Sequence, residues 1–439
     1  MFGLSSREFR FVIVISAIHL SQHFFMRLIP PLIPVLAVAF EYPLWQLGLL
    51  VSMFSLGAGV FQAPFGLLAD QYDRLYLITS GVALMGFGFI AFSQSSVLGH
   101  LLPSVVILGN SFTGAYVLML LAMLIAGIGA AATHPAAYPM ITDNVSVTNK
   151  GKVLGAFGSS AKFGDAVAPA IVGVLLLVLF WEYIVLLLGT LGVITAVVFY
   201  LILRTDEFET VPASKRRKEN TKDATTVSFS DIEKRRFLYP LIIIYLFFIS
   251  KNFSGEGLKT YLPAFIVVIY AYSFDIGGVY VSPESAANFY FALLLIFAGI
   301  LQLFIGGLTD TVDNRLILLI GSLFGAVGYL SIAILELGPV TLFLALCIAG
   351  LGIFGLAPAR DSLISDISPP ELEGRTFGYI WTAIMVTSAL MTPVVGYIID
   401  VQGMRSGFLI LTGGIVFAAA IVLVLFSSAF TVDQHVDNL

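Results

Sequence analysis

The sequence predicts an all-α membrane protein of twelve transmembrane helices, arranged as two pseudo-symmetric bundles of six. The first observation behind this prediction is composition, because 58% of the 439 residues are hydrophobic and only 11% are charged, whereas about a quarter of the residues of a soluble protein are charged. The second is that apolar runs of roughly 20 residues, the length that crosses a bilayer as a helix, recur throughout the chain. The predicted spans are 11–39, 44–68, 75–93, 115–141, 152–179, 182–203, 237–269, 287–308, 316–335, 340–364, 375–399 and 406–428.

The third observation is an internal repeat. A short charged hinge between two apolar runs occurs twice at an offset of 240 residues, with Gly66, Leu68, Asp70 and Asp73 matching Gly306, Leu308, Asp310 and Asp313. Further along, the offset is 223 and pairs Pro135 with Pro358, and near the two starts it is 229 and pairs Arg27 with Glu256. The repeat divides the chain into an N-terminal bundle of residues 1–203, a basic cytoplasmic linker of residues 204–236 and a C-terminal bundle of residues 237–439.

Basic residues gather on one side of the predicted spans. Lys and Arg are retained on the cytoplasmic side, and with the amino terminus inside, Arg405 is the only basic residue in the outer loops. We therefore expect a multi-pass protein of the cell membrane with both termini cytoplasmic. The basic linker fits contact with anionic membrane lipid or, more simply, a flexible connection. Residues 97–109 are apolar but too few to span, and are interpreted as an interfacial or re-entrant piece.

Several classes of function find no support in the sequence. The net charge of −5 averages a basic inner rim with acidic outer loops, and it does not imply nucleic-acid binding. A single cysteine, Cys347, excludes an intramolecular disulfide and a cysteine metal cluster. Phosphate-binding glycine loops, metal-ligand spacings and nucleophiles with a partner base are absent from the sequence. We therefore expect neither an enzyme nor a bound metal or cofactor.

The first predicted helix carries three polar residues at four-residue spacing. His19, His23 and Arg27 therefore share one face, which we expect to turn toward the bundle interior because polar groups are costly in hydrocarbon. Imidazole carries protons near neutral pH, so both histidines are candidates for proton coupling, and Arg27 is a candidate anion contact. The alternative for the histidines is a structural hydrogen bond to a neighbouring helix. Pro30 and Pro34 are expected to break this helix.

The hinge at residues 66–74 places charges at the inner rim. Asp70 can accept hydrogen bonds from the amino-terminal NH groups of another helix, and Arg74 is expected at the lipid headgroups. With the twelve spans and the duplication, the chain resembles the major facilitator superfamily, whose hinge reads Gly-x-Leu-Ala-Asp-Arg-x-Gly-Arg-Lys. The residues that match this pattern are Gly66, Leu68, Ala69, Asp70 and Arg74, and those that depart from it are Gln71, Asp73 and Leu75.

This resemblance implies the major facilitator fold and a gate at the inner side of the membrane. It implies that Asp70 engages the amino end of helix 11 near Arg375, and that Asp310 engages the amino end of helix 5 near Lys152. Together with Arg74, these residues would latch the inner side shut. The alternative is that they are ordinary solvated loop charges.

The end of the fourth predicted helix carries a narrower resemblance. His134 before Pro135 resembles the His-Pro found at this place in the fosmidomycin-resistance branch of exporters, and we expect His134 either to act at the gate or to cap the helix end. Met123 stands where many proton-coupled members of the superfamily have an arginine.

The fifth predicted helix carries two charges three residues apart. Lys162 and Asp165 share one face, as an anion contact and a proton carrier or as a buried pair that only fixes packing. Gly164, Pro169 and Gly173 match part of the family's antiporter pattern, Gly-x-x-x-Gly-Pro-x-x-Gly-Gly, which favours export.

The seventh predicted helix is the most polar of the twelve. Glu256 and Lys259 lie three residues apart, and Lys251 falls close to the same face. Gly255 and Gly257 predict a softened, discontinuous helix of the kind found at transporter binding sites. Residues 250–253 (Ser-Lys-Asn-Phe) also resemble the start of this helix in the fosmidomycin-resistance branch.

The balance of charge within the spans favours an anionic cargo. Away from the ends of the spans, the charged residues are four cations, Arg27, Lys162, Lys251 and Lys259, and two carboxylates, Asp165 and Glu256. Because an uncompensated charge in a low dielectric is expensive, we expect alternating access of a small organic anion, such as a phosphonate, phosphate ester or carboxylate, by a monomer.

Proton coupling is expected through His19, His23, Asp165 or Glu256. Export by proton antiport is the first expectation, and uptake of an organic anion by proton symport is the second. A non-transporting membrane sensor is the alternative from another class, and it would require a sizeable soluble domain that this sequence does not contain.

Overall fold

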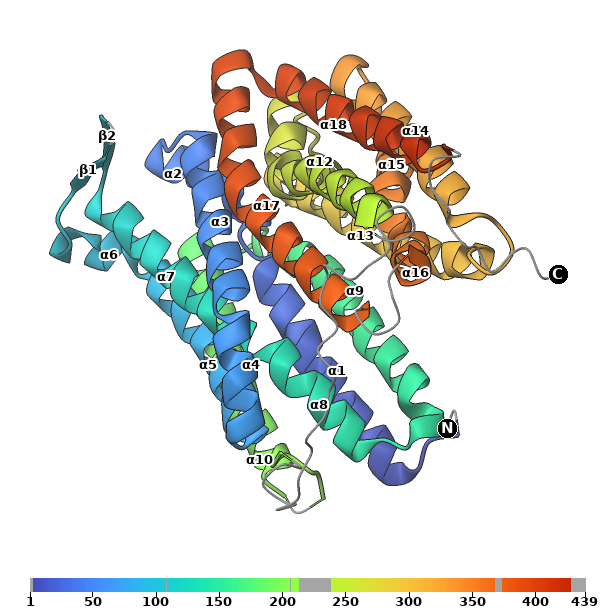
Figure 1. Cartoon of the computed structure of the whole chain (residues 1–439). Helices are drawn as coiled ribbons and strands as arrows, with labels where there is room; N and C mark the ends of the chain where they lie inside the picture. The colour runs from blue at the N-terminus through green and yellow to red at the C-terminus, as the bar shows by residue number, and fades with distance from the viewer. Residues whose placement is uncertain (1–2, 108, 206, 213–237, 368–372, 428–439) are drawn as a thin grey trace. The chain divides into compact units, whose positions relative to one another are not determined.

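The computed structural model describes residues 3–107, 109–205, 207–212, 238–367 and 373–427, with the helix backbone alone over 373–382 (Figure 1). The chain divides into two compact units. Unit 1 comprises Met1–Glu41, Leu49–Asn220 and Phe274–Asn288, and unit 2 comprises Tyr42–Gly48, Thr221–Ser273 and Phe289–Leu439. Each unit thus takes most of one half of the sequence and a short segment from the other half.

The first half of the chain is almost entirely helical. Its helices are α1 (Ser6–Met26), η1 (Pro30–Leu32), α2 (Ile33–Phe40), α3 (Leu44–Val60), α4 (Gln62–Gln71), α5 (Arg74–Ser93), α6 (Ser95–Leu98), η2 (Gly99–Leu101), α7 (Gly114–Ala131), α8 (Thr133–Asn144), η3 (Val147–Asn149), α9 (Lys150–Leu175) and α10 (Trp181–Leu203). Within unit 1, α1 packs along α9 and α5 packs between α7 and α10.

The second half repeats this plan with fewer breaks. Its helices are α12 (Tyr239–Ile269), α13 (Pro283–Leu308), α14 (Asn314–Ile334), α15 (Pro339–Gly350), the π-helical turn η6 (Leu351–Gly355), α16 (Ala357–Ile367), α17 (Glu373–Gln402) and α18 (Met404–Val424). Within unit 2, α18 packs against both α12 and α14. Part of the apolar core of unit 2 is formed by Leu241, Phe247, Leu318, Leu363 and Leu425.

Among the described residues, eleven helical segments are long and apolar enough to cross a membrane. Four of them, Ser6–Phe40, Leu44–Gln71, Gly114–Asn144 and Pro339–Ile367, consist of two helices joined by a break. The remaining predicted span, 152–179, corresponds to α9, a continuous helix that carries Lys162 and Asp165. The prediction of an all-α protein with many membrane-spanning helices is therefore confirmed.

Three of these four breaks occur at the predicted prolines or at matching positions of the repeat. As predicted from the prolines, α1 ends at Met26, and α2 begins at Ile33 after the turn of η1. Ala132 separates α7 from α8, and its repeat partner at an offset of 223, Gly355, ends the π-helical turn before α16. Helices 4 and 10 are thus interrupted at the same position of the repeat.

Glycines bring equivalent helices together in the two halves. A Cβ on Gly88 would lie 2.7 Å from the carbonyl oxygen of Ala122, and a Cβ on Gly328 would lie 2.8 Å from that of Ala345. Gly328 is Gly88 displaced by 240 residues, whereas Ala345 is Ala122 displaced by 223. The two offsets found in the sequence therefore meet in one helix contact, which confirms that the halves are repeats.

Two short β-hairpins follow helices α6 and α12, and the sequence reading did not predict them. In the first, β1 (Val105–Ile107) pairs with β2 (Asn110–Phe112), and in the second, β3 (Phe274–Ile276) pairs with β4 (Val279–Val281). Gly277 and Gly278, at φ values of 62° and 85°, form the second turn, a conformation that glycine adopts without strain. In the stretch 97–109, expected to be interfacial or re-entrant, Gly99–Leu101 form a helical turn and Val105–Ile107 form the first strand of the first hairpin.

Candidate functional site

The polar face predicted for helix 1 lies against α9 in unit 1. His19 is 4% exposed, Arg27 7% and Asp165, on α9, 6%. The two helices approach closely because α9 presents a glycine, since a Cβ on Gly164 would lie 2.4 Å from the carbonyl oxygen of Leu20. The prediction that the helix 1 face turns toward protein is therefore confirmed, and its neighbour is the charged face of helix 5.

One carboxylate oxygen receives both an imidazole and a guanidinium. Asp165 Oδ1 lies 3.1 Å from His23 Nδ1 and 3.0 Å from Arg27 Nε. Because a carboxylate only accepts hydrogen bonds, both nitrogens donate to it. Removing one partner of such a buried pair leaves an uncompensated charge, so the protonation of Asp165 and the charge of Arg27 are physically linked. Lys162, one turn before Asp165 on α9, is half-buried.

An aromatic cluster surrounds the ring of His19 on α1. The rings of His19 and Phe157 stack with centroids 3.8 Å apart, and His19 Nδ1 donates to the Phe157 carbonyl oxygen at 2.7 Å. The ring of His134, at the start of α8, meets the His19 ring edge-to-face at 5.1 Å. The sequence suggested a gate or a helix cap for His134 and gave no sign of this contact. Among the described residues, no group of three or more His, Cys, Asp or Glu side chains has the geometry of a metal site.

In unit 2, the polar residues of helix 7 are buried as the sequence predicted. Lys251 is 6% exposed, Glu256 6% and Lys259 8%. The Lys259 ammonium donates to Glu256 Oε1. Two aromatic rings also face the lysines, because Lys251 Nζ lies 5.8 Å from the centroid of Phe247 and Lys259 Nζ lies 5.8 Å from that of Phe354. This half therefore holds a carboxylate and two ammonium groups in an aromatic-lined setting.

The expectation of a discontinuous helix 7 is wrong. α12 runs without interruption over its 31 residues, through Gly255 and Gly257. A Cβ on Gly257 would lie 2.5 Å from Leu411 Cδ2, so this glycine makes room for α18 rather than breaking the helix.

The expectation that Arg74 lies at the lipid headgroups is also wrong. Arg74 is 5% exposed, and its Nη1 donates to Asp143 Oδ2 on α8 at 2.7 Å, while its Nε donates to the Ala69 carbonyl oxygen at 3.1 Å. The guanidinium turns inward because Asp143 provides a carboxylate that the headgroup interpretation had ignored. Arg74 therefore ties the start of α5 to α8 within unit 1.

The remaining residues of the expected gate are placed only individually. Asp70, Asp310 and Lys152 are exposed, and Lys152 Nζ lies 3.5 Å from Asn149 Oδ1. The side chain of Arg375 lies outside the described residues. The contacts expected between Asp70 and Arg375 and between Asp310 and Lys152 would join residues of different units, and they stay predictions.

The first residues after α10 are docked onto unit 1, although the sequence favoured a flexible linker. The Asn144 side chain pairs with the backbone of Glu209, donating to its carbonyl oxygen and accepting from its NH, both at 2.8 Å. Arg7 Nε donates to the Glu207 carbonyl oxygen at 2.6 Å. The segment is therefore held by α1 and α8, while residues 213–236 of the predicted linker lie outside the described residues.

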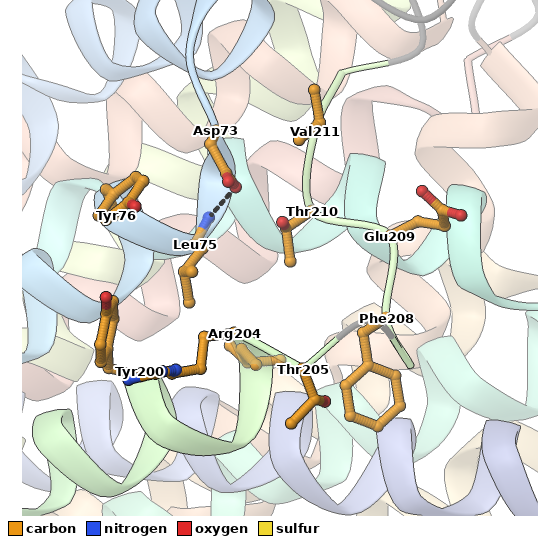
Figure 2. Close-up of a pocket in the computed structure, with 11 residues that line it drawn as sticks. Asp73, Leu75, Tyr76, Tyr200, Arg204, Thr205, Phe208, Glu209, Thr210 and Val211 are labelled. Atoms are coloured by element: carbon orange, nitrogen blue, oxygen red, sulfur yellow. Dashed lines mark hydrogen bonds between the residues drawn. The ribbon is translucent and has the colours of Figure 1, made fainter.

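This docked segment borders a pocket of about 570 Å³ (Figure 2). Figure 2 shows residues at the start of α5, at the end of α10 and in the docked segment, namely Asp73, Tyr76, Tyr200, Arg204, Thr205, Phe208, Glu209, Thr210 and Val211. Asp73 Oδ1 accepts from the Leu75 NH at 2.9 Å, so this carboxylate caps α5. The residues that line the pocket include none of the predicted substrate, proton or gate residues.

Comparisons with known proteins identify the family of this architecture. The profile of the Major Facilitator Superfamily matches residues 15–287 and 280–436. The chain is 22% identical over 403 residues to the probable L-galactonate transporter of Escherichia coli strain K12, covering 90% of this chain and 82% of that protein. It is 22% identical over 404 residues to the hexuronate transporter of Bacillus subtilis strain 168, covering 87% and 85%. It is 24% identical over 364 residues to the multi-drug resistance efflux pump PmrA of Streptococcus pneumoniae, covering 80% of each chain.

Solved structures show the same fold. A bacterial homolog of the human lysosomal transporter Spinster, in an inward-facing and occupied conformation, superposes with a TM-score of 0.75 at 16% identity, covering 96% of this chain and 97% of the other. A D-xylose-proton symporter superposes with a TM-score of 0.76 at 14% identity, covering 97% and 99%. The superfamily resemblance seen in the sequence is thereby confirmed, as is the expectation that the protein is not an enzyme. The chain belongs to the Major Facilitator Superfamily of multi-pass membrane transporters.

Proposed function

We propose that this transporter moves a small organic anion by alternating access, coupled to protons. The observation that carries the proposal is the shared contact of His23 and Arg27 with Asp165 Oδ1, which joins a proton-carrying group and an anion-binding group in one buried network. Rocking of two halves about a central binding region is the mechanism typical of the superfamily.

The charge of the spans and the names of two relatives support an anionic cargo. The cations exceed the carboxylates by two, and the substrate-binding residues would be Arg27, Lys162, Lys251 and Lys259. The E. coli and B. subtilis relatives are named for L-galactonate and for hexuronates, which are sugar acids with a carboxylate. A sugar acid offers one negative charge for these cations and several hydroxyl groups for the polar side chains nearby.

The Arg27–Asp165 contact supports cotransport of the proton with the anion. Ionised Asp165 neutralises Arg27 and repels an incoming anion, whereas protonated Asp165 does neither. Proton binding therefore raises the affinity for the anion, and by reciprocity the anion raises the affinity for the proton. This linkage favours uptake by proton symport as the working mode.

Export by proton antiport is the second candidate. Its support is the partial antiporter pattern at Gly164, Pro169 and Gly173, the name of the efflux pump PmrA, and the resemblance of His134-Pro135 to the fosmidomycin-resistance branch. Antiport requires the proton and the cargo to exclude one another, and a cationic or neutral cargo at Asp165 would satisfy that condition better than an anion.

The roles proposed for individual residues follow from these two arguments. Proton coupling is assigned to His19, His23, Asp165 and Glu256, and gating to Asp70, Arg74, Asp310, Lys152, Arg375 and His134. We further propose that the protein acts as a monomer in the cell membrane with both termini in the cytoplasm.

Flux measurements in proteoliposomes test the proposal. With radiolabelled D-galacturonate and L-galactonate as probes, we expect accumulation inside when the outside is acidic. Accumulation only when the inside is acidic would establish antiport instead. Transport of a lipophilic cation such as ethidium in preference to both acids would overturn the anionic cargo, and counterflow without any response to either pH gradient would overturn proton coupling.

Two variants then distinguish the roles of the two carboxylates in proton coupling. Asp165→Asn and Glu256→Gln are compared in counterflow, which moves no net protons, and in gradient-driven flux. We expect the residue that carries the coupled proton to lose gradient-driven flux and to keep counterflow. If both variants retain gradient-driven flux, neither carboxylate has that role.

A further inference from the structure

Three imidazole rings form a continuous line in unit 1. The ring of His134 on α8 lies 5.1 Å from the ring of His19, which lies 4.9 Å from the ring of His23, and both pairs meet edge-to-face. His23 Nδ1 lies 3.1 Å from Asp165 Oδ1 on α9. Side chains from α8, α1 and α9 thus connect a carboxylate to the break between α7 and α8.

The partners of His19 fix which of its nitrogens carries the hydrogen. Nδ1 lies 2.7 Å from the Phe157 carbonyl oxygen, which only accepts, so Nδ1 carries the hydrogen and Nε2 presents a lone pair. Among the described residues, this Nε2 has no hydrogen-bond partner, although His19 is only 4% exposed. A buried acceptor without a donor is costly, so this nitrogen can take a hydrogen bond from a donor on a neighbouring ring.

His134 has the complementary arrangement. Its Nδ1 lies 3.5 Å from the amide nitrogen of Gln62, which donates, so Nδ1 accepts and Nε2 carries the hydrogen. The His134 ring also stacks on Tyr138 with centroids 5.8 Å apart. A ring with a donor Nε2 therefore lies beside a ring whose Nε2 lacks a donor.

We propose that His134 is the third member of a proton relay, His134–His19–His23, that delivers the coupled proton to Asp165. This inference rests on the proposed proton coupling and adds a residue and a route to it. A proton binds at His134 Nδ1, and the hydrogen on His134 Nε2 passes to His19 Nε2. His19 then passes that hydrogen to His23 Nε2, and the hydrogen on His23 Nδ1 passes to Asp165 Oδ1.

Each ring gains one hydrogen and releases one. The net change is that one proton moves from the α8 side to Asp165, whose carboxylate becomes a neutral carboxylic acid. His134 and His23 end with their hydrogens on the opposite nitrogens, whereas His19 keeps its Nδ1 hydrogen on Phe157. The relay resets when His134 and His23 return to their starting tautomers.

The cations that interact with this line lie at its Asp165 end. Arg27 and Lys162 lie beside Asp165 at one end, whereas Tyr138 and Gln62 contact His134 at the other end. Both cations also stabilise the ionised Asp165 carboxylate, so an anion that compensates their charge favours delivery of the proton to Asp165. Protonation of Asp165 in turn removes the negative charge beside Arg27, so the end of the relay coincides with the onset of cargo binding.

Replacement of His134 by a hydrogen-bonding residue that cannot carry a proton tests the relay. In proteoliposomes with D-galacturonate, we expect His134→Gln to lower gradient-driven flux by about 100-fold more than it lowers counterflow, the low end of what a positioned proton-transfer group contributes. His100→Asn is the matched control, because His100 is exposed and bonded to the Val97 carbonyl oxygen, and it should change neither mode.

The possible outcomes separate the relay from its alternatives. Unchanged gradient-driven flux in His134→Gln overturns the relay, and loss of both modes in His134→Gln and in His134→Phe, which keeps a ring against Tyr138, shows a structural role instead. Absence of gradient-driven flux in the wild type overturns proton coupling itself, and the relay as a transport route with it.

A second readout does not depend on cargo. Nitrogen NMR of the purified full chain with isotope-labelled histidine should show His19 hydrogenated at Nδ1, with a titration that changes in His134→Gln and not in His100→Asn. A His19 titration that is the same in the wild type and in His134→Gln would show that the two rings do not exchange a proton.

Discussion

The same helix contact is ionic in the first half of the chain and neutral in the second. His23 and Asp165 correspond through the repeat to Asn252 and Ser388. His23 Nδ1 lies 3.1 Å from Asp165 Oδ1, and Asn252 Nδ2 donates to Ser388 Oγ at 3.2 Å. The position and the length of the contact are kept, while at this contact only the first half has groups that can hold a proton.

A second pair of contacts differs in the same way. Arg74 donates to Asp143, and their repeat partners are Asn314 and Asp366, which also meet, with Asn314 Nδ2 3.3 Å from Asp366 Oδ2. The contact of Gly88 with helix 4, by contrast, recurs without chemical change at Gly328. The repeat therefore preserves helix packing and lets the charge diverge, which places the imidazole–carboxylate chemistry in unit 1.

The largest difference between the halves is expected at the contact of helix 1 with helix 5 and at its counterpart in the second half, the contact of helix 7 with helix 11. Asp165→Asn removes the negative charge that Arg27 and His23 contact, which should cost about 3–5 kcal/mol of unfolding free energy and abolish gradient-driven flux. The matched change Ser388→Ala removes only a neutral hydrogen bond, worth about 1 kcal/mol. Chemical denaturation in detergent and flux in proteoliposomes measure both, and equal effects of the two variants would refute the functional asymmetry.

A substitution of Arg74, at the start of α5, tests the second pair of contacts, Arg74 with Asp143 and Asn314 with Asp366. Arg74→Ala removes the guanidinium that donates to Asp143, at a cost of about 3 kcal/mol, because the Arg74 side chain is only 7% exposed. Arg74→Asn copies the second half, where Asn314 serves the equivalent aspartate, and we expect it to restore part of the loss in thermal unfolding. If Arg74→Asn is as unstable as Arg74→Ala, the two contacts are not equivalent.

The sequence predicted the elements that depend on spacing. Four-residue spacing placed His19, His23 and Arg27 on one face, and steady offsets between matching residues revealed the repeat. These features are periodic along the chain, so a helical geometry is enough to convert them into positions in space.

The sequence did not predict contacts that depend on tertiary packing. His134 lies far from His19 in the chain, and no local pattern shows that the α7–α8 break turns its ring toward α1. Arg74 was assigned to lipid because its partner, Asp143, lies on another helix, although the repeat had already aligned Asp143 with Asp366. The β-hairpins were missed because strands of three residues carry too little alternation to be recognised.

The packing that the halves share should respond equally to the same change. Gly88→Ala and Gly328→Ala each place a methyl group against the helix 4 or helix 10 backbone, and overpacking of this kind typically costs about 1–3 kcal/mol. We expect similar decreases in thermal stability for the two variants. A loss in only one of them would show that the scaffold, as well as the charge, has diverged.

The smallest effect is expected at the neutral copy of the proton-carrying contact. Asn252→Ala removes the hydrogen bonds to the Ile384 carbonyl oxygen and to Ser388 Oγ, at 3.0 and 3.2 Å, and should cost about 1–3 kcal/mol if the acceptors stay buried. Because Asn252 carries no titratable proton, the dependence of flux on pH should keep its shape, whereas His23→Ala should change it. A shifted pH profile in Asn252→Ala would mean that the second half takes part in proton coupling through this contact, and the division of chemistry between the repeats would then fail.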